Sequence, residues 1–269
     1  MIEVTYLMAS TEALIRSLTS IISRNLNVAL VLTNVFLGIV ALSVPYFTKY
    51  LERHVFTPKL DILFKLEPPF CHLTSWRIIS VNGNPVSEPV YYFRFLVRNA
   101  GKSRARGCEV VLNGLWIHKD GQKKKIQNFS PINLQWTAGV VGQAPPQYID
   151  INPENRGYFC NIGHISSRRY QIEREKFIDA PGFPACTANH SRFMFDFLQV
   201  FNAQSNYLCP GIKYTLEIGV YSENSSYKNA FFDILWSGNW KDRQEDMFKP
   251  DTIDIQLRDN LGRLHGLLK

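Results

Sequence analysis

A long apolar stretch without a single charge occupies residues 27–47, NVALVLTNVFLGIVALSVPYF. Its length matches the ~20 residues that a helix needs to cross about 30 Å of hydrocarbon. A core helix that is apolar on every side is rare in a chain of 269 residues. A signal peptide would begin nearer Met1, would have a shorter apolar part and would end at a small-residue cleavage site. The pattern therefore predicts a transmembrane helix over residues 27–47.

The segment before this stretch, residues 1–26, mixes apolar and polar positions at helical spacing. Leucines and isoleucines recur at intervals of three or four residues from Leu14 to Leu26, which predicts an amphipathic helix. This helix either lies on the membrane surface or continues the span. Pro45 is expected to kink or loosen the last turn of the span, and residues 48–58 are expected to form a juxtamembrane linker.

From Pro58 onward the apolar positions recur with period two instead of 3.6, which predicts β-strands. Tyr91, Phe93, Phe95 and Val97, for example, share one face of the run at residues 90–98. Turn formers such as Asp120-Gly121 separate the runs, and no amphipathic helix alternates with them. This pattern predicts a mainly β domain built as a sandwich of antiparallel sheets. The predicted strands are 60–66, 76–80, 90–98, 108–117, 157–162, 192–201, 212–221, 230–236 and 252–257.

The sandwich domain is predicted to cover residues 59–258. A polar insertion at 165–190 interrupts the strand pattern and is expected to hold one short helix at 169–177. Residues 259–269 form a C-terminal tail.

The charges beside the apolar stretch bear on its orientation. Two arginines precede it, whereas four lysines and arginines lie between residues 49 and 65 after it. Positive residues collect on the cytoplasmic side of a span, so the C-terminal domain is expected in the cytoplasm. The five cysteines form no C-x-x-C pair and are odd in number, which favours a reducing compartment over one or two disulfides. The chain is thus predicted to be a single-pass membrane protein with five reduced thiols.

The run VRNAGKSRARGCEV, residues 97–110, ends one predicted strand and begins the next. Its pattern V-R-N-A-G-x-S-x-A-x-x-C-x-V resembles, over residues 95–111, a strand pair of bacterial and archaeal immunoglobulin-like adhesion domains and CARDB-type domains. The chain as a whole resembles prokaryotic proteins that carry one membrane span and a β-sandwich. The resemblance implies an immunoglobulin-like sandwich, and it implies no catalytic residue.

The same run contains Gly101-Lys102-Ser103, which match the end of the phosphate-binding loop G-x-x-x-x-G-K-[ST]. Leu96 stands where that loop needs its first glycine. The residues after Ser103 alternate like a strand, whereas a phosphate-binding loop opens a helix whose amides hold the phosphates. The run is therefore predicted to be a strand-to-strand connection in which Asn99 and Gly101 supply the turn geometry.

Other residue patterns give no sign of catalysis or metal binding. The six histidines form neither H-x-H nor H-E-x-x-H, no serine lies in a glycine elbow, and the cysteines lack zinc-site spacing. A metal site assembled from separate strands is the alternative that spacing leaves open. The sequence predicts no catalytic residue, no metal and no cofactor, so the chain is not expected to be an enzyme.

The positive charge is concentrated in residues 94–125, where nine lysines and arginines accompany only two acidic residues. Most of it lies in two loops, 101–107 and 118–125. The ten-residue strand between them places the loops roughly 30 Å apart. Loops at opposite ends of a sandwich do not form one nucleic-acid surface, so nucleic acid is not expected as a partner.

Strand direction predicts which of these loops faces the membrane. If every strand reverses the direction of the one before it, residues 101–107 lie far from the membrane and residues 118–125 lie near it. The triplet of lysines in the second loop is then expected to contact anionic membrane lipids. These residues are Lys123, Lys124 and Lys125.

Two further features concern binding. Trp236 and Trp240 form either an aromatic platform for a sugar or peptide or, in the interpretation we favour, one core tryptophan and one that covers a sheet end. Asn34 lies within the predicted span, where an asparagine gains by hydrogen bonding across helices. It indicates a membrane-protein partner or a homo-oligomer formed through the span.

The sequence therefore predicts a membrane-anchored, non-catalytic β-sandwich that acts as an interaction, scaffold or sensing module at the membrane surface. The alternative is a sensor that binds a small anionic or sugar ligand and signals through the single span. A filled sandwich would favour the interaction module, and a deep pocket would favour the sensor.

Overall fold

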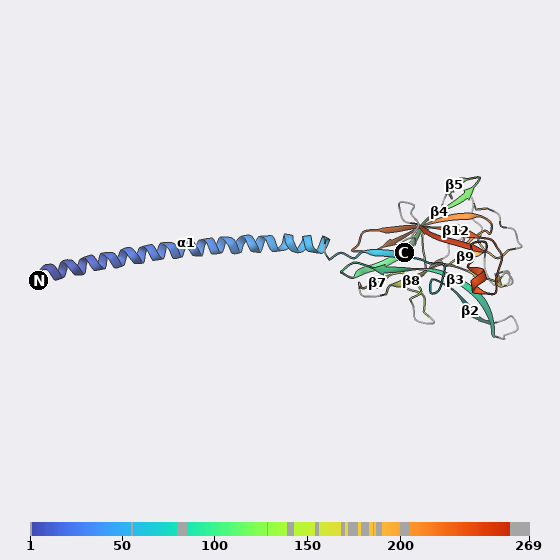
Figure 1. Ribbon diagram of the computed structural model, residues 1–269, viewed down its shortest axis with the longest axis horizontal. Coiled ribbons are helices and arrows are strands. Elements are labelled where there is room, and N and C mark those ends of the chain that lie inside the picture. The colour runs from blue at the N-terminus through green and yellow to red at the C-terminus, as the bar shows by residue number, and fades with distance from the viewer. Residues whose placement is uncertain are drawn as a thin grey trace. The chain divides into compact units, whose positions relative to one another are not determined.

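Two compact units make up the chain, Met1–Phe56 and Thr57–Lys269 (Figure 1). The computed structural model describes residues 2–54, 56–79, 85–127, 129–138, 143–153, 156–167, 170–171, 177–178, 183–184, 186, 190–199 and 205–258. The predicted helix at 169–177 lies mostly outside these residues, and the predicted tail at 259–269 lies entirely outside them.

The first unit is a single helix, α1, which covers Ile2–His54 and includes Pro45. The predicted amphipathic segment and the predicted span are therefore one helix, and residues 48–54, expected to lie in a linker, are helical. Their sequence TKYLERH contains four good helix formers, and a proline inside a helix removes one backbone hydrogen bond without always ending the helix. Within α1, the segment Ala13–Leu51 contains an 18-residue window with a mean hydropathy of 2.2, and none of that window is buried. This segment is long and apolar enough for a membrane span, and its length and composition also fit a signal sequence.

The second unit is mainly β and consists of two antiparallel sheets, which confirms the predicted fold class at that level (Figure 1). In the described residues the first sheet has six strands in the order β1-β3-β8-β9-β10, with β2 also paired to β3. These strands are β1 (Leu60–Leu63), β2 (Cys71–Ile79), β3 (Pro85–Asn99), β8 (Tyr158–Ser166), β9 (Phe193–Phe195) and β10 (Tyr207–Leu208).

The second sheet has seven strands within the described part of the chain, in the order β13-β12-β11-β4-β5, with β6 and β7 also paired to β4. A single helical turn, α3 (Gln244–Met247), precedes β13. The strands of this sheet are β4 (Ala105–Lys119), β5 (Gln122–Lys125), β6 (Ile132–Asn133), β7 (Ile149–Ile151), β11 (Lys213–Tyr221), β12 (Lys228–Trp236) and β13 (Ile253–Arg258).

One hydrophobic core lies between the two sheets. Tyr91, Phe93, Phe95 and Val97, predicted to share one face of β3, are fully buried. The ring of Phe95 lies 5.4 Å from that of Phe232 on β12 in the opposite sheet. Buried residues of both sheets belong to the same cluster, so the alternating pattern of the sequence reflects two layers packed face to face.

Strands β1 and β2 run in the same direction, because both are antiparallel to β3. β1 pairs with the last part of β3, with Leu60 opposite Asn99, and β2 pairs with the first part, with Ile79 opposite Pro85. The prediction that every strand reverses the one before it is therefore wrong at this step. The chain enters the domain at Thr57, and β3 returns to that point.

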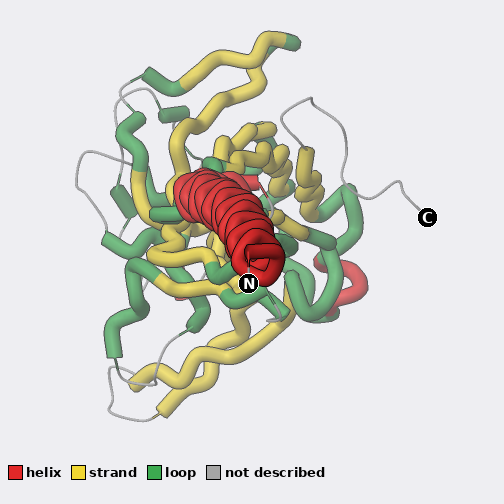
Figure 2. Tube along the Cα trace, turned by 90° about the vertical axis from the view of Figure 1, so that its left-hand side faces the viewer, coloured by secondary structure: helices red, strands yellow, loops and turns green. Residues whose placement is uncertain are grey.

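The domain accordingly has two opposite ends. The Thr57 end comprises residues 57–59, 99–106, 150–153, 156–157 and 222–227, and the Asp120 end holds the turn between β4 and β5. Asp120 and Gly121 have φ values of 52° and 73°, as a two-residue type I′ hairpin turn requires. The β4–β5 pair and the β2–β3 pair extend from the body of the domain on opposite sides (Figures 1 and 2).

Candidate functional site

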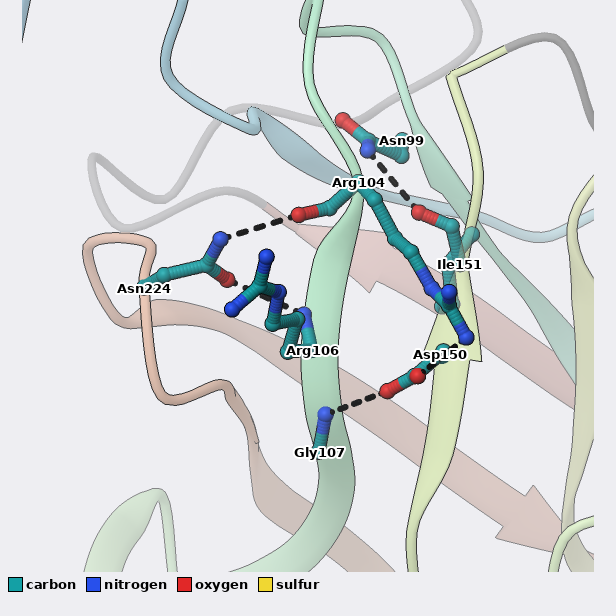
Figure 3. Close-up of polar contacts among 7 residues, drawn as sticks. All are labelled: Asn99, Arg104, Arg106, Gly107, Asp150, Ile151 and Asn224. Carbon is teal, nitrogen blue, oxygen red and sulfur yellow. Dashed lines mark hydrogen bonds and ion pairs between the residues drawn. The ribbon is translucent and has the colours of Figure 1, made fainter. Parts of the chain in front are cut away.

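One buried side chain organises the connection between β3 and β4. Asn99 is 2% exposed, and its Oδ1 accepts hydrogen bonds from the backbone N–H groups of Lys59 (3.0 Å) and Gly101 (2.9 Å). Its Nδ2 donates to the carbonyl oxygens of Ser103 (2.6 Å) and Ile151 (3.0 Å), the second of which Figure 3 shows. The amide thus uses its whole capacity of two donors and two acceptor positions on backbone groups. It joins the start of the domain, the connection and β7.

Gly101 fits this connection because the backbone passes very close to the start of the domain. A Cβ atom at this position would lie 2.4 Å from the Thr57 carbonyl oxygen and 2.5 Å from the Lys59 nitrogen. Its φ lies outside the left-handed range, so the predicted role in turn geometry is corrected to one of close approach. A strand and no helix follows the Gly-Lys-Ser run, which confirms that these residues do not form a phosphate-binding loop.

Two further polar side chains fix the beginning of β4 (Figure 3). Asp150 accepts a hydrogen bond from the Gly107 N–H at 2.7 Å and forms an ion pair with Arg104. Asn224 accepts from the Arg106 N–H and donates to the Arg104 carbonyl, each at 2.9 Å. The Gly107 N–H and, more weakly, the Arg104 guanidinium hold the pKa of Asp150 below its usual value, against the opposing effect of desolvation. The basic connection is therefore a fixed part of the fold.

The lysines predicted to contact lipid lie in the edge strand β5. Lys123 packs its Nζ 4.8 Å from the centre of the Trp116 ring, and Lys125 packs its Nζ 5.3 Å from the same ring. Lysines on an edge strand also discourage pairing with other chains. Because β1 and β2 run in the same direction, these residues lie at the Asp120 end, away from the point where the chain enters the domain. The direction argument that placed Lys123, Lys124 and Lys125 beside the membrane was wrong, and their contact with lipid stays a prediction.

Trp236 and Trp240 do not form a joint surface platform. Trp236 is 1% exposed in the core, and its Nε1 donates to the Ser191 carbonyl at 2.7 Å. Trp240 is half-buried, packs on Tyr91 at a ring distance of 5.0 Å and donates to Asp242. A ring that is enclosed on all sides cannot stack on a sugar, so the alternative with one core tryptophan describes Trp236.

A cluster of histidine and aromatic side chains lies on the outer face of the first sheet, and sequence reasoning missed it. His164 on β8 and Asp196 after β9 approach to 2.6 Å between Nδ1 and Oδ1, with each side chain about 10% exposed. The Trp76 ring lies 4.8 Å from the His164 ring and donates its N–H to the Tyr92 hydroxyl at 2.8 Å. A carboxylate at Nδ1 fixes the orientation of an imidazole. Such an enclosed pair mainly orders the packing of this face, and the spacing along the chain gave no signal for it.

A second polar cluster occupies the outer face of the second sheet. His118 Nε2 lies 2.7 Å from Thr215 Oγ1, and Thr215 donates to Asp233 at 2.7 Å. Lys213 and Arg258 also pair with Asp233, at 3.2 and 2.7 Å. Desolvation would raise the pKa of Asp233, but these hydrogen bonds and charges together hold it below its usual value.

This second cluster contains the residue types of a hydrolase triad in a different arrangement. The carboxylate of Asp233 contacts the hydroxyl group, whereas a triad needs it on the imidazole. Thr215 is 1% exposed, so its hydroxyl presents no nucleophile to solvent. The cluster links four neighbouring strands, β4, β11, β12 and β13, and is a stabilising network.

Two of the five cysteines are joined. Cys186 and Cys209 form a disulfide with Cα atoms 5.3 Å apart, and Cys209 is buried beside Tyr207 and Met194. The prediction of five reduced thiols is therefore wrong for this pair, because residues 23 positions apart in sequence meet in the fold. Cys71, Cys108 and Cys160 are free and buried, and burial raises the pKa of Cys108 to about 12.

Within the described residues, no group of three His, Cys, Asp or Glu side chains is arranged to hold a metal ion. A cavity of about 150 Å³ is smaller than the roughly 300–1,000 Å³ of typical small-molecule sites. It is lined by Pro131, Ile132, Asn133, Gln147, Leu198 and Gln199.

Comparison of the chain with protein-family models, with curated proteins and with solved structures gave no match. The resemblance of residues 95–111 to CARDB-type domains therefore rests on those residues alone.

Proposed function

We propose that the protein is a membrane-anchored, non-catalytic β-domain that acts as an interaction or scaffold module at the membrane surface. The observation that supports this proposal is a filled two-sheet core attached in sequence to a long apolar helix with exposed side chains. Large rings such as Phe93, Phe95 and Phe232 occupy the space between the sheets, so binding falls to the outer surface. The cavity beside Pro131 is smaller than the sites that usually hold small ligands, so it does not by itself support a sensor for a small anionic or sugar ligand.

We also propose that the sandwich is of the immunoglobulin-like kind. In that fold the second strand lies between the first and the fifth, and the third, sixth and seventh strands are neighbours in the other sheet. Here β3 lies between β1 and β8, while β4, β11 and β12 are neighbours in the second sheet. The other described strands, β2, β5, β6, β7, β9, β10 and β13, lie outside this pattern.

The partner within the membrane is proposed to be a second copy of the chain, joined through Asn34. Two other polar side chains inside the predicted span donate to their own helix, Thr33 to Ala29 and Ser43 to Val40, each at 2.9 Å. Asn34 has no side-chain hydrogen bond to any residue that the structure describes. An amide in hydrocarbon gains about 0.6–2 kcal/mol from a partner on another helix.

The full chain in its native membrane tests both statements. The wild type should resist alkaline carbonate extraction and should crosslink to itself, and Asn34→Leu should lower the crosslinked yield severalfold while leaving the chain in the membrane. Extraction by carbonate would contradict the anchored module. An unchanged yield for Asn34→Leu would contradict the role of Asn34 alone.

We propose further that the domain lies on the oxidising side of the membrane. Structural disulfides persist in the periplasm, in the secretory pathway and at the cell surface, and are rare in the cytosol. The charge count that favoured the cytoplasm rests on a difference of two residues. The Cys186–Cys209 bond is the more direct indicator of the compartment, and it supports the opposite orientation to the one expected from the charges.

Thiol labelling tests this orientation. After denaturation without reductant, a maleimide should modify the three free cysteines, and reduction should expose two more. In intact cells, an impermeant reductant followed by an impermeant maleimide should label Cys186, which is half-buried, because Cys209 and the three free thiols are buried. The Cys186→Ser/Cys209→Ser variant is the control and should stay unlabelled. Modification of all five cysteines without reductant would show that the domain is cytoplasmic.

A further inference from the structure

The Thr57 end of the domain carries exposed positive charges that form no ion pair with any residue that the structure describes. Lys59, Lys102, Arg106 and Arg156 are exposed, and none forms an ion pair with a described residue. Other arginines at this end are neutralised, since Arg98 pairs with Asp61 at 3.0 Å and Arg104 pairs with Asp150. Glu223 is the exposed carboxylate among the described residues 222–227. The unpaired groups therefore leave this end basic.

The fold brings three of these four charges together by backbone contacts. The Ala100 N–H donates to the Lys59 carbonyl at 2.7 Å, and the Lys102 N–H donates to the Thr57 carbonyl at 3.4 Å. Arg106 follows at the start of β4, where Asn224 accepts a hydrogen bond from its N–H. Arg156 belongs to the same end, because Gly157 beside it approaches the Val97 carbonyl oxygen at the end of β3.

The position of these residues along the chain keeps them close to the predicted span. If the hydrocarbon ends near residue 47, the helix continues for seven residues at ~1.5 Å each, which adds about 10 Å. The chain from His54 to Thr57 spans at most about 11 Å. The headgroup layer itself takes up roughly 5–7 Å on each side of the hydrocarbon. The beginning of the domain at Thr57 is thus held within about two Debye lengths, ~8–10 Å each, of the lipid surface.

We propose that the Thr57 end of the domain binds anionic phospholipid headgroups through Lys59, Lys102, Arg106 and Arg156. Ammonium and guanidinium groups donate to phosphate oxygens, and guanidinium can do so with two parallel bonds. This surface replaces the triplet in β5, which lies at the other end of the domain. The proposal rests on the proposed membrane anchorage and adds the surface that would hold the domain against the bilayer.

The test uses the full chain in nanodiscs made of phosphatidylcholine alone or mixed with phosphatidylglycerol. All five tryptophans lie in the domain, so energy transfer from tryptophan to a dansyl-labelled lipid reports how close the domain is to the bilayer. Transfer should be higher with phosphatidylglycerol, and high salt should remove the difference. Loss of each basic residue should weaken docking about fivefold, so Lys59/Lys102/Arg106/Arg156→Gln should abolish the lipid-dependent difference.

The matched control is Lys119/Lys123/Lys124/Lys125→Gln, which removes the same charge from exposed residues at the Asp120 end. It should keep the dependence on anionic lipid. Equal losses in both variants would show a general effect of net charge and overturn the proposal. A larger loss of the lipid-dependent energy transfer in the control variant would overturn the proposal as well. The same holds if the wild type inserts but shows equal energy transfer with and without phosphatidylglycerol. A chain that does not insert at all would contradict the membrane anchorage instead.

Discussion

Replacing Asn99 with alanine is expected to lower the free energy of unfolding of the domain by about 3–5 kcal/mol. The substitution leaves two N–H groups and two carbonyl oxygens without their present partner. An unpaired buried polar group costs ~1–3 kcal/mol, and water can reach some of the four because the connection is only partly buried. The whole stability of such a domain is about 5–15 kcal/mol, so the effect should be plain in chemical denaturation followed by tryptophan fluorescence.

Asn133→Ala is the control for this experiment. Its side chain makes one hydrogen bond, to Glu109 at 3.0 Å, and is half-buried. We expect a loss of about 1 kcal/mol or less. If Asn99→Ala cost no more than Asn133→Ala, the Asn99 network would not hold the Thr57 end together.

The extent to which the sequence predicts this fold follows from what each pattern reports. Alternation along residues 90–98 reports that one side of a strand is buried, and the buried face of β3 is as predicted. Alternation says nothing about which strand lies next to which. The break between β1 and β2 was interpreted as a reversal of chain direction. In the structure β2 runs in the same direction as β1, because both strands are antiparallel to β3. Counting strands therefore placed the two basic loops at exchanged ends of the domain.

Edge and bridging elements escaped prediction for a different reason. Strand β5 is QKKK, and all four residues are exposed, so it has no apolar face that could produce alternation. Its Asp120-Gly121 turn was visible in the sequence, and the register of the hairpin follows from that turn. The short strands β6, β7 and β10 have two or three residues each, which is too few for a period to be recognised.

The candidate site was predictable in part. The Asn-x-Gly pattern indicated a structured connection after β3, and its general place was right. Two of the four partners of Asn99, Lys59 and Ile151, are 40 and 52 residues away in sequence. No local pattern reports contacts of that range. The same limit applies to Cys186 with Cys209 and to His164 with Asp196, which meet only because β8, β9 and β10 are neighbours.

Truncation of Trp236 is expected to have the second large effect, a loss of about 3–5 kcal/mol for Trp236→Ala. The side chain is 1% exposed, and its removal leaves a cavity in the core and the Ser191 carbonyl without its donor. Trp240→Ala should cost clearly less, about 1–2 kcal/mol, because that ring is half-buried and its N–H bonds to the exposed Asp242.

Trp236→Phe separates the two contributions of the first tryptophan. Phenylalanine keeps most of the buried ring volume and lacks the N–H that reaches Ser191, so the variant should lose about 1–3 kcal/mol. Urea denaturation of the full chain in detergent, followed by circular dichroism, ranks the three variants. The loss in free energy of unfolding should be largest for Trp236→Ala if this ring fills the core. The losses for Trp236→Phe and Trp240→Ala should be smaller and similar, or should decrease in that order. Equal and small losses for both alanine variants would instead mean that the two rings share a surface, because truncating a solvent-facing ring leaves no cavity behind.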